Sequence, residues 1–494
     1  MTPPVASART TSEAFGWRAA QLGGTQLISL LRLLVLARIV APDAFGLVAV
    51  ATVTIGLLMG LSNLGVVQAL VQRESPRNEE YDAAWTLGVL RAAVVTAVLM
   101  LIGPLVAGLY GEPAAGPIVR AMALRPLIDA AGSIGVARLT RTLAFRRLAF
   151  MALPASVIDA VTAIALAPAF GVWALVIGTL AGALVQTALS YVLAPHRPRF
   201  RLDAGTTTPL VRYGQWIMLT GIVGLVATSI TQMALSRTLG VAALGVYVVA
   251  SRLAFLPSVT AGAVVGAVAF PLYAAHRDDD HRRAATFGAL FTGQAMVLYP
   301  VIAIIIALAP AFEAAMGGRW AGTAPTTQIL AAACIIGVFG ETVTPLLLGR
   351  GRADRAFQLE LVQSAVRLIL LWPLMRLFGI PGAALAWLGG NAAAQVVSVT
   401  FARDDVRASI CPARKRLVAA ALASVLAAAV AASLGAILTG FTALVVGGGA
   451  AVLIAAGTLW LLDRLQDLRL PELLPWHANW GPRATPPTQA TLDA

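Results

Sequence analysis

The sequence predicts an all-α polytopic membrane protein with about 14 transmembrane helices, built as two parallel six-helix lobes plus two C-terminal helices. Three observations lead to this fold class. The chain of 494 residues is 59% hydrophobic and only 12% charged, about half the charged fraction of a soluble domain. Its apolar runs reach the roughly 20 residues that cross a hydrocarbon core. A segment at residues 36–51 also recurs at residues 235–250.

Apolar stretches bounded by charged residues, glycine or proline give the expected helices. Their expected bounds are 17–40, 46–70, 84–110, 116–137, 150–169, 172–194, 213–236, 243–274, 286–309, 325–348, 357–376, 380–402, 417–437 and 440–462. The connecting loops alternate between a basic set, which includes RTLAFRR, HRDDDHRR and RDDVRASICPARKR, and a set with almost no basic residue, which includes PDAFG and GEPAAG. This alternation follows the positive-inside rule and predicts that both termini are cytoplasmic.

The recurring segment divides the chain. LARIVAPDAFGLVAVA and LSRTLGVAALGVYVVA match at six of sixteen positions without a gap, including Arg38 with Arg237 and Gly46 with Gly245. The copies lie six helices apart, so the duplication predicts parallel lobes with a cleft between them. The expected divisions are a flexible cytoplasmic N-terminus (1–13), an N-lobe (14–202), a C-lobe (203–403), helices 13 and 14 (404–465) and a partly disordered cytoplasmic tail (466–494).

Polar residues inside the first expected helix predict one wall of the cleft. Gln21, Thr25, Ser29 and Arg32 form a single stripe on an apolar helix, and the matching stripe of helix 7 contains Thr228 and Thr231. Arg32 lies past the middle of its span, where insertion costs on the order of 2.5–3.5 kcal/mol. We therefore expect Arg32 to face water or a ligand rather than lipid. The alternative for such a stripe is a helix-packing seam.

Other spans also carry polar groups, and arginine outnumbers carboxylate among them. The further expected cavity residues are Arg91, Arg252, Arg367, Asn391 and Gln395, and the candidates for ion coupling are Asp129, Asp159 and Glu341. Arg125 lies one turn before Asp129, so an i,i+4 ion pair explains these two as well as a functional role does. A cationic cleft indicates an anionic cargo, and guanidinium groups suit phosphate through bidentate hydrogen bonds.

Arg38 and Arg237 have a different interpretation. Each ends its helix at the expected outer surface. There an arginine can extend to the interface and a cation is favoured at the C-terminal end of a helix. We therefore expect both to act as anchors and caps.

The sequence offers little support for an enzyme. The single lysine, Lys415, lies in CPARKR without a neighbouring glycine, so the chain carries no P-loop. The four histidines lie outside the expected spans, and we expect neither a metal site nor a cofactor. The basic residues cluster in short loops between apolar runs, which indicates membrane topology rather than nucleic-acid binding.

Several segments resemble the Wzx-type oligosaccharide flippases, in the polysaccharide transporter family of the multidrug/oligosaccharidyl-lipid/polysaccharide exporter superfamily. The likeness begins with LARIVAPDAFGLVAVA and LGVVQALVQRE and continues in order through LTRTLAFRRLAF, FGVWALVIGTLAG, GVYVVASRLAFLPS, FPLYA, GGRWAGTAPTTQILAAA and GIPGAALAW. It extends from residue 15 to about residue 399. Expected helices 13 and 14 carry no matching motif.

The resemblance implies a flippase of the bacterial inner membrane that works by alternating access. Its implied cargo is an undecaprenyl-diphosphate-linked oligosaccharide repeat unit, moved to the periplasmic leaflet for O-antigen, exopolysaccharide or capsule synthesis. Its implied partners are this lipid-linked substrate, the bilayer, and polymerase and chain-length or export proteins. Two alternatives stay open: a proton- or sodium-coupled multidrug exporter of the same superfamily, whose cleft should hold carboxylates and aromatic residues, and a non-transporting scaffold of polysaccharide assembly.

Overall fold

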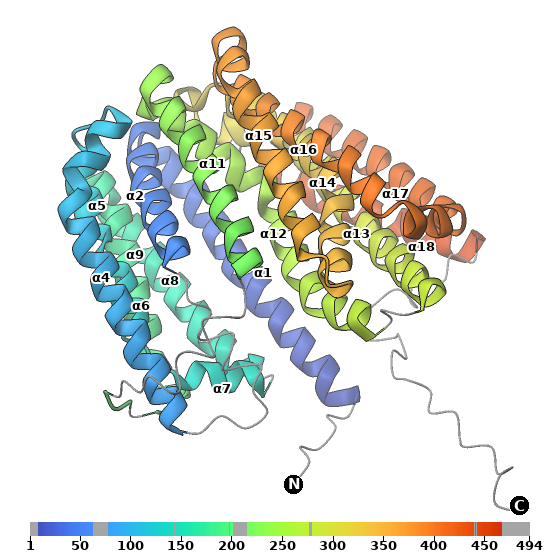
Figure 1. The fold of residues 1–494 in the computed structure, drawn as a ribbon. Coiled ribbons are helices and arrows are strands. Elements are labelled where there is room, and N and C mark those ends of the chain that lie inside the picture. The colour runs from blue at the N-terminus through green and yellow to red at the C-terminus, as the bar shows by residue number, and fades with distance from the viewer. Residues whose placement is uncertain are drawn as a thin grey trace, which may run out of the picture.

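The computed structural model describes residues 8–62, 78–142, 144–196, 198–200, 215–275, 279–438, 440 and 442–466. The regular elements in these ranges are all helices (Figure 1). Thirteen of them are long and apolar enough to cross a membrane. The predicted fold class, an all-α protein with many membrane spans, is confirmed.

The helices fall into two groups that follow each other along the chain. The first group, here called the N-lobe, contains α1 (Ala8–Ile39), α2 (Pro42–Leu61), α4 (Asn78–Tyr110), α5 (Ala115–Met122), α6 (Leu124–Ala130), α7 (Gly135–Arg141), α8 (Phe145–Phe170) and α9 (Val172–Leu193). The second, the C-lobe, contains α11 (Gln215–Leu239), α12 (Val241–Ala275), α13 (Asp280–Met316), the 3-10 turn η1 (Gly318–Trp320), α14 (Thr323–Gly349), α15 (Ala353–Phe378) and α16 (Ile380–Phe401).

Two further helices complete the fold. They are α17 (Arg403–Ile437) and α18 (Gly448–Gln466), the second preceded by the π-helical turn η2 (Ala443–Gly447). Helix α17 packs along α13, and α18 packs on α17, so this pair extends the C-lobe and leaves the N-lobe uncovered (Figure 1).

Three predicted boundaries were wrong. The expected helix at 116–137 is split into α5, α6 and the start of α7; Pro126 lacks an N–H and clashes with the preceding turn, which explains why α5 ends at Met122. The expected basic loop RDDVRASICPARKR is part of α17, which begins at Arg403. Acidic residues in its first turn stabilise that start, and Asp405 is buried against Arg283 at 2.9 Å and Arg350 at 3.0 Å. Helix α1 begins at Ala8, inside the segment expected to be flexible.

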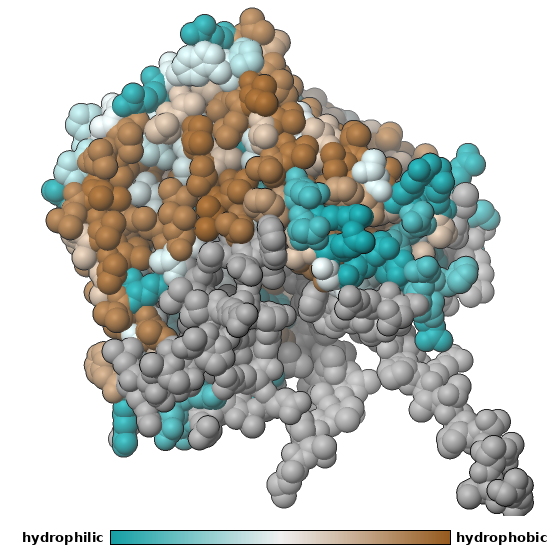
Figure 2. Space-filling view, viewed as in Figure 1, coloured by the Kyte–Doolittle hydropathy of each residue, from teal (hydrophilic) through white to brown (hydrophobic). Residues whose placement is uncertain are grey.

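The outer surface of the bundle is apolar. Leu101, Leu105, Ile369, Leu377 and Leu453 each expose more than 60% of their surface. Figure 2 shows a broad hydrophobic zone over the middle of one face, with hydrophilic residues gathered toward the ends. Large exposed aliphatic side chains over such an area favour a lipid environment. The chain is a multi-pass membrane protein.

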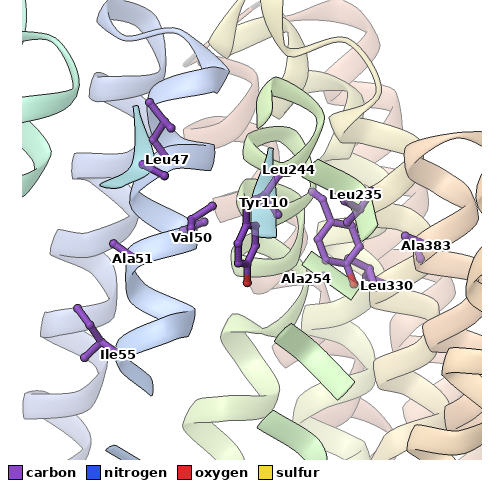
Figure 3. Packing of buried hydrophobic residues seen from close by; sticks show 14 of the residues in the cluster. Leu47, Val50, Ala51, Ile55, Tyr110, Leu235, Leu244, Ala254, Leu330 and Ala383 are labelled. Carbon is purple, nitrogen blue, oxygen red and sulfur yellow. The ribbon is translucent and has the colours of Figure 1, made fainter. Parts of the chain in front are cut away.

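The two lobes meet along α2, which packs against both α11 and α12. A hydrophobic cluster of buried residues fills this contact, among them Val50, Leu235 and Leu244 (Figure 3). In Figure 3, Leu47, Val50, Ala51 and Ile55 follow one another along α2. Because these side chains are small or medium-sized, the helices approach closely. Polar cavities lie beside this contact.

The two ends of the bundle differ in their connections. At one end, called here the turn end, single glycines with positive φ join consecutive helices: Gly171 at 53°, Gly240 at 88° and Gly379 at 62°. These short links hold neighbouring helices antiparallel. The other end, called the basic end, carries the arginine-rich connections at residues 141–147 and 350–355 and the start of α17.

Candidate functional site

Three cavities follow one another through the interior of the bundle. The N-lobe cavity has a volume of about 360 Å³, the bridging cavity about 390 Å³ and the C-lobe cavity about 470 Å³. The first two share Ser29, Gln232 and Arg252, and the last two share Phe255 and Val259. Residues of α12 line all three, so the cavities form one path from the N-lobe to the C-lobe.

The N-lobe cavity is basic. Arg32, Arg125 and Arg252 line it together with one carboxylate, Asp159. The Arg32 Nη2 atom lies 3.0 Å from Asp159 Oδ1, and Arg125 forms the expected i,i+4 pair with Asp129 at 3.5 Å. Arg252 is exposed to the cavity and makes no salt bridge within the described residues. It is therefore the guanidinium of this wall that is free to bind an anion.

Glycines of α9 make room for Asp159. A Cβ atom at Gly178 would lie 2.7 Å from the Asp159 carbonyl oxygen, and one at Gly182 would lie 2.8 Å from the Asp159 Cβ. This Gly-x-x-x-Gly seam lets α8 and α9 pack backbone to backbone. The carboxylate is thereby held beside α1, where Arg32 neutralises it. The pairing joins a predicted cargo-binding residue to a predicted ion-coupling residue.

We expect Asp159→Ala to destabilise the protein more than the double change Arg32→Met with Asp159→Ala. The Arg32 side chain is 14% exposed, so removal of the carboxylate leaves a largely buried unpaired charge, which costs about 3 kcal/mol or more. The thermal unfolding midpoint of the purified protein in one detergent would measure this. A double variant that melts below the single variant would contradict the pairing.

The C-lobe cavity has the opposite character. Glu341, Glu360, Asn391, Gln395 and Trp387 line it. The Gln294 Nε2 atom donates to Glu341 Oε2 at 2.6 Å, and the Ser364 hydroxyl donates to Glu360 Oε1 at 3.0 Å. Within the described residues, its wall holds carboxylates, amides and aromatic rings but no basic side chain.

The structure brings some predicted site residues onto the cavity walls and leaves others elsewhere. Those on a wall are Ser29, Arg32, Arg252, Asn391, Gln395, Asp159 and Glu341. Those that line none of the three cavities are Gln21, Thr25, Arg91, Thr228, Thr231, Arg367 and Asp129. Thr228 and Thr231 each donate to a carbonyl of their own helix at 2.8 Å. Arg367 is 2% exposed and stacks on Trp387.

Sequence reasoning missed several polar or aromatic residues of these walls, among them Gln26, Gln232, Glu360 and Trp387. Gln232 follows Thr231 directly, so the polar stripe on α11 was placed about 100° away from the face that lines the cavity. Glu360 lies near the start of its helix, where a carboxylate is common at the membrane surface. Trp387 could not be predicted as a wall residue, because its contact with Arg367 on the neighbouring helix is visible only in the fold.

The repeated arginines close the turn end. Arg237 donates to the carbonyl oxygens of Leu109 at 2.7 Å and Gly108 at 2.6 Å, and Arg38 donates to the carbonyl oxygen of Ala315. These carbonyls belong to the last turns of α4 and α13. Each arginine therefore caps a helix of the opposite lobe, where a cation is favoured. The expected capping by these two arginines is found, but each caps a helix of the opposite lobe and not its own helix.

The repeated glycines make a second, reciprocal contact at the same end. A Cβ atom at Gly46 of α2 would overlap the carbonyl oxygen of Val241 in α12, and one at Gly245 would overlap that of Pro42 in α2. Pro42 and Val241 occupy matching positions of the repeat. The indole Nε1 of Trp320 adds a bond to the Ala37 carbonyl at 2.7 Å. We call these contacts the clasp. They hold the two lobes together at the turn end and close the N-lobe cavity there.

The helical fold and its chain of interior cavities are those of a membrane transporter. A solved structure with this fold is the lipid II flippase MurJ in an inward closed conformation, which superposes with a TM-score of 0.66 at 14% identity, over 92% of this chain and 99% of that one. The likeness at this identity concerns the fold.

The sequence matches a family directly. The chain belongs to the polysaccharide biosynthesis protein family, whose model matches residues 35–325. It is 28% identical over 366 residues to the succinoglycan biosynthesis transport protein ExoT of Rhizobium meliloti, covering 74% of each chain. It is 24% identical over 347 residues to the lipopolysaccharide biosynthesis protein WzxC of Escherichia coli, covering 68% of this chain and 69% of that one. The resemblance inferred from short motifs is confirmed.

Proposed function

We propose that the protein is a flippase that carries a diphosphate-linked polyprenyl oligosaccharide from the cytoplasmic to the periplasmic leaflet of a bacterial inner membrane. The basic N-lobe cavity, with Arg252 unpaired on its wall, is the observation that carries this proposal. Guanidinium groups bind phosphate oxygens in bidentate fashion and keep their charge when partly buried. The likeness to ExoT, named a succinoglycan biosynthesis transport protein, and to WzxC, named a lipopolysaccharide biosynthesis protein, supports it.

The orientation follows from the charge of the loops. The arginine-rich connections at the basic end support a cytoplasmic location for that end and for both termini. The clasp then closes the cavity toward the periplasm. Transport requires the lobes to separate at the clasp and approach at the basic end, which is alternating access by rocking of two parallel lobes. The polymerase and the chain-length or export proteins of the same polymer are the expected partners, and no catalytic step is assigned to this chain.

The decisive experiment is deletion of the gene in its native strain. Full-length lipid-linked repeat units should accumulate on the cytoplasmic face, and the extracellular polymer should fall to background. The measurement is mass spectrometry of extracted lipid-linked oligosaccharides, with leaflet assigned by their accessibility to a glycosidase added outside spheroplasts. Normal lipid-linked pools with intact polymer would refute the proposal.

A proton- or sodium-coupled multidrug exporter is the second candidate. The C-lobe cavity favours it, because Glu341, Glu360 and Trp387 together could hold an organic cation. The basic N-lobe cavity and the family argue against it. The deletion strain separates the two, since loss of an exporter raises sensitivity to cationic drugs and leaves the lipid-linked pools normal.

A further inference from the structure

The C-lobe cavity holds polar groups that are already fixed in place. The Asn391 Nδ2 atom donates to the Ala333 carbonyl at 2.7 Å, and the Gln395 Nε2 atom donates to Asn391 Oδ1 at 3.0 Å. Glycines on α14 make room for both amides: a Cβ at Gly340 would lie 2.6 Å from Gln395 Nε2. The Gln395 Oε1 atom is buried and has no hydrogen-bond partner. It is an acceptor that a bound donor would satisfy.

An aromatic ring completes this wall. Trp387 is fixed by two neighbours: the guanidinium carbon of Arg367 lies 4.5 Å from its ring centroid, and the ring of Phe255 lies 5.2 Å away, tilted by 38°. A fixed indole offers a flat apolar surface, and the C–H face of a pyranose ring stacks on such surfaces. The Arg367 side chain is buried and is not among the residues that line the cavity.

The two lobes have inverted charges at matching positions. Aligning Phe170-Gly171 with Phe378-Gly379 places Asp159 opposite Arg367 and Gly182 opposite Gly390. Asp159 lies on the wall of its cavity and is paired with Arg32, whereas Arg367 does not line its cavity. The N-lobe cavity nevertheless presents guanidinium groups, one of them from α12 of the C-lobe, whereas the C-lobe cavity presents carboxylates.

The distance between the two environments suits one ligand. Arg252 and Val259 are seven residues apart on α12, which corresponds to about 10 Å along a helix. This is roughly the length of one or two sugar rings. A molecule with its diphosphate at Arg252 would extend through the bridging cavity toward the C-lobe cavity, which Trp387, Gln395 and Glu360 line.

We propose that the C-lobe cavity is a saccharide subsite for the sugar nearest the diphosphate, and that it selects a neutral or amino sugar over an acidic one. The proposal rests on the flippase function proposed above. Carboxylates and an amide oxygen accept hydrogen bonds from hydroxyl or ammonium groups. A uronic acid would place a third carboxylate beside Glu341 and Glu360 with no basic side chain on the described wall, and like charges across an interface are strongly disfavoured.

Binding of four matched lipids to the purified full-length protein tests this proposal. The probes are a short-chain polyprenyl diphosphate and the same lipid carrying glucose, glucosamine or glucuronic acid. Glucose and glucuronic acid differ only at C6, so their comparison isolates charge. We expect glucose and glucosamine to tighten binding relative to the bare diphosphate, and glucuronic acid to bind about tenfold more weakly than glucose.

Variants assign the effect to the cavity. Glu360→Gln should reduce the preference for glucose over glucuronic acid, and Gln395→Ala should remove the gain from glucose without changing binding of the bare diphosphate. Gln358→Ala is the matched control, because Gln358 is exposed on the same helix as Glu360 and lies outside the cavity. Thermal melting of each variant verifies folding.

The outcomes separate this proposal from the proposed function. Equal affinities for glucose and glucuronic acid in the unchanged protein would overturn the subsite, whatever the variants do. A sugar preference that persists in a folded Glu360→Gln, Gln395→Ala double variant would overturn its location. Failure of all four lipids to bind would instead refute the flippase function.

Discussion

Replacement of Arg252 by alanine is expected to abolish polymer export while leaving the protein folded in the membrane. Arg252 lines both the N-lobe and the bridging cavity and has no salt-bridge partner within the described residues. Its removal therefore breaks no internal ion pair. Hydrogen bonds to charged groups contribute about 1.5–3 kcal/mol each, so loss of even one such bond to a phosphate corresponds to a roughly ten- to hundredfold loss of affinity.

The measurement is complementation of the deletion strain, with extracellular polymer and lipid-linked pools quantified at matched protein levels. Arg252→Lys should rescue in part, because it keeps the charge but loses the planar fork of donors. Arg376→Ala is the matched control, because this exposed arginine stacks on Trp372 and lines none of the three cavities. Full export by Arg252→Ala would remove the main support for the diphosphate site.

Arg32→Ala should tell less about cargo binding than the position of Arg32 inside the membrane suggested. Its Nη2 atom is already engaged by Asp159 at 3.0 Å, so its loss exposes a carboxylate to the cavity in addition to removing a cation. We therefore expect Arg32→Ala to lower both export and the unfolding midpoint, whereas Arg252→Ala lowers export alone. Quantified polymer and thermal melting of the two purified variants measure the difference. Equal melting losses would show that Arg252 is also structural.

The sequence was sufficient to predict the spans, because an apolar run of about 20 residues and the alternation of loop charge are each local signals. The broken helix around Pro126 was misjudged because proline acts on the backbone of the preceding turn, while overall apolarity continues through it. The beginning of α17 was misjudged because burial of Asp405 between Arg283 and Arg350 depends on contacts distant in sequence. One of these two errors therefore came from a local backbone effect and the other from contacts distant in sequence.

Site prediction depended on the rotation of each helix about its axis. A residue inside a span can face lipid, another helix or a cavity, and one position changes the direction by about 100°. Arg252 and Thr231 were equally good candidates from sequence, yet Arg252 faces the cavity and Thr231 is buried in packing. The clasp was beyond sequence reasoning, since Arg38 capping its own helix and Arg38 capping α13 leave the same pattern in the chain.

A substitution in the clasp is the second change expected to have a large effect on polymer export. Gly46→Val should hold the lobes apart at the turn end, because the new side chain would overlap the Val241 carbonyl in the backbone of α12. Backbone cannot yield as a flexible side chain can, so the closed arrangement becomes unavailable. The protein should still insert, since valine is apolar and small, but polymer export in the deletion strain should fall to background.

Accessibility of a cysteine placed at Thr52 reports the open clasp. Thr52 lines the N-lobe cavity beneath the clasp, and in the closed protein a membrane-impermeant maleimide added outside intact cells should not reach it. In the Gly46→Val background the same cysteine should be labelled. Gly56→Val is the matched control on α2, because nothing lies within 4 Å of a Cβ at Gly56, and it should leave both export and protection intact. If Gly46→Val exports polymer normally with its cysteine still protected, the glycine contact cannot be what closes the cavity.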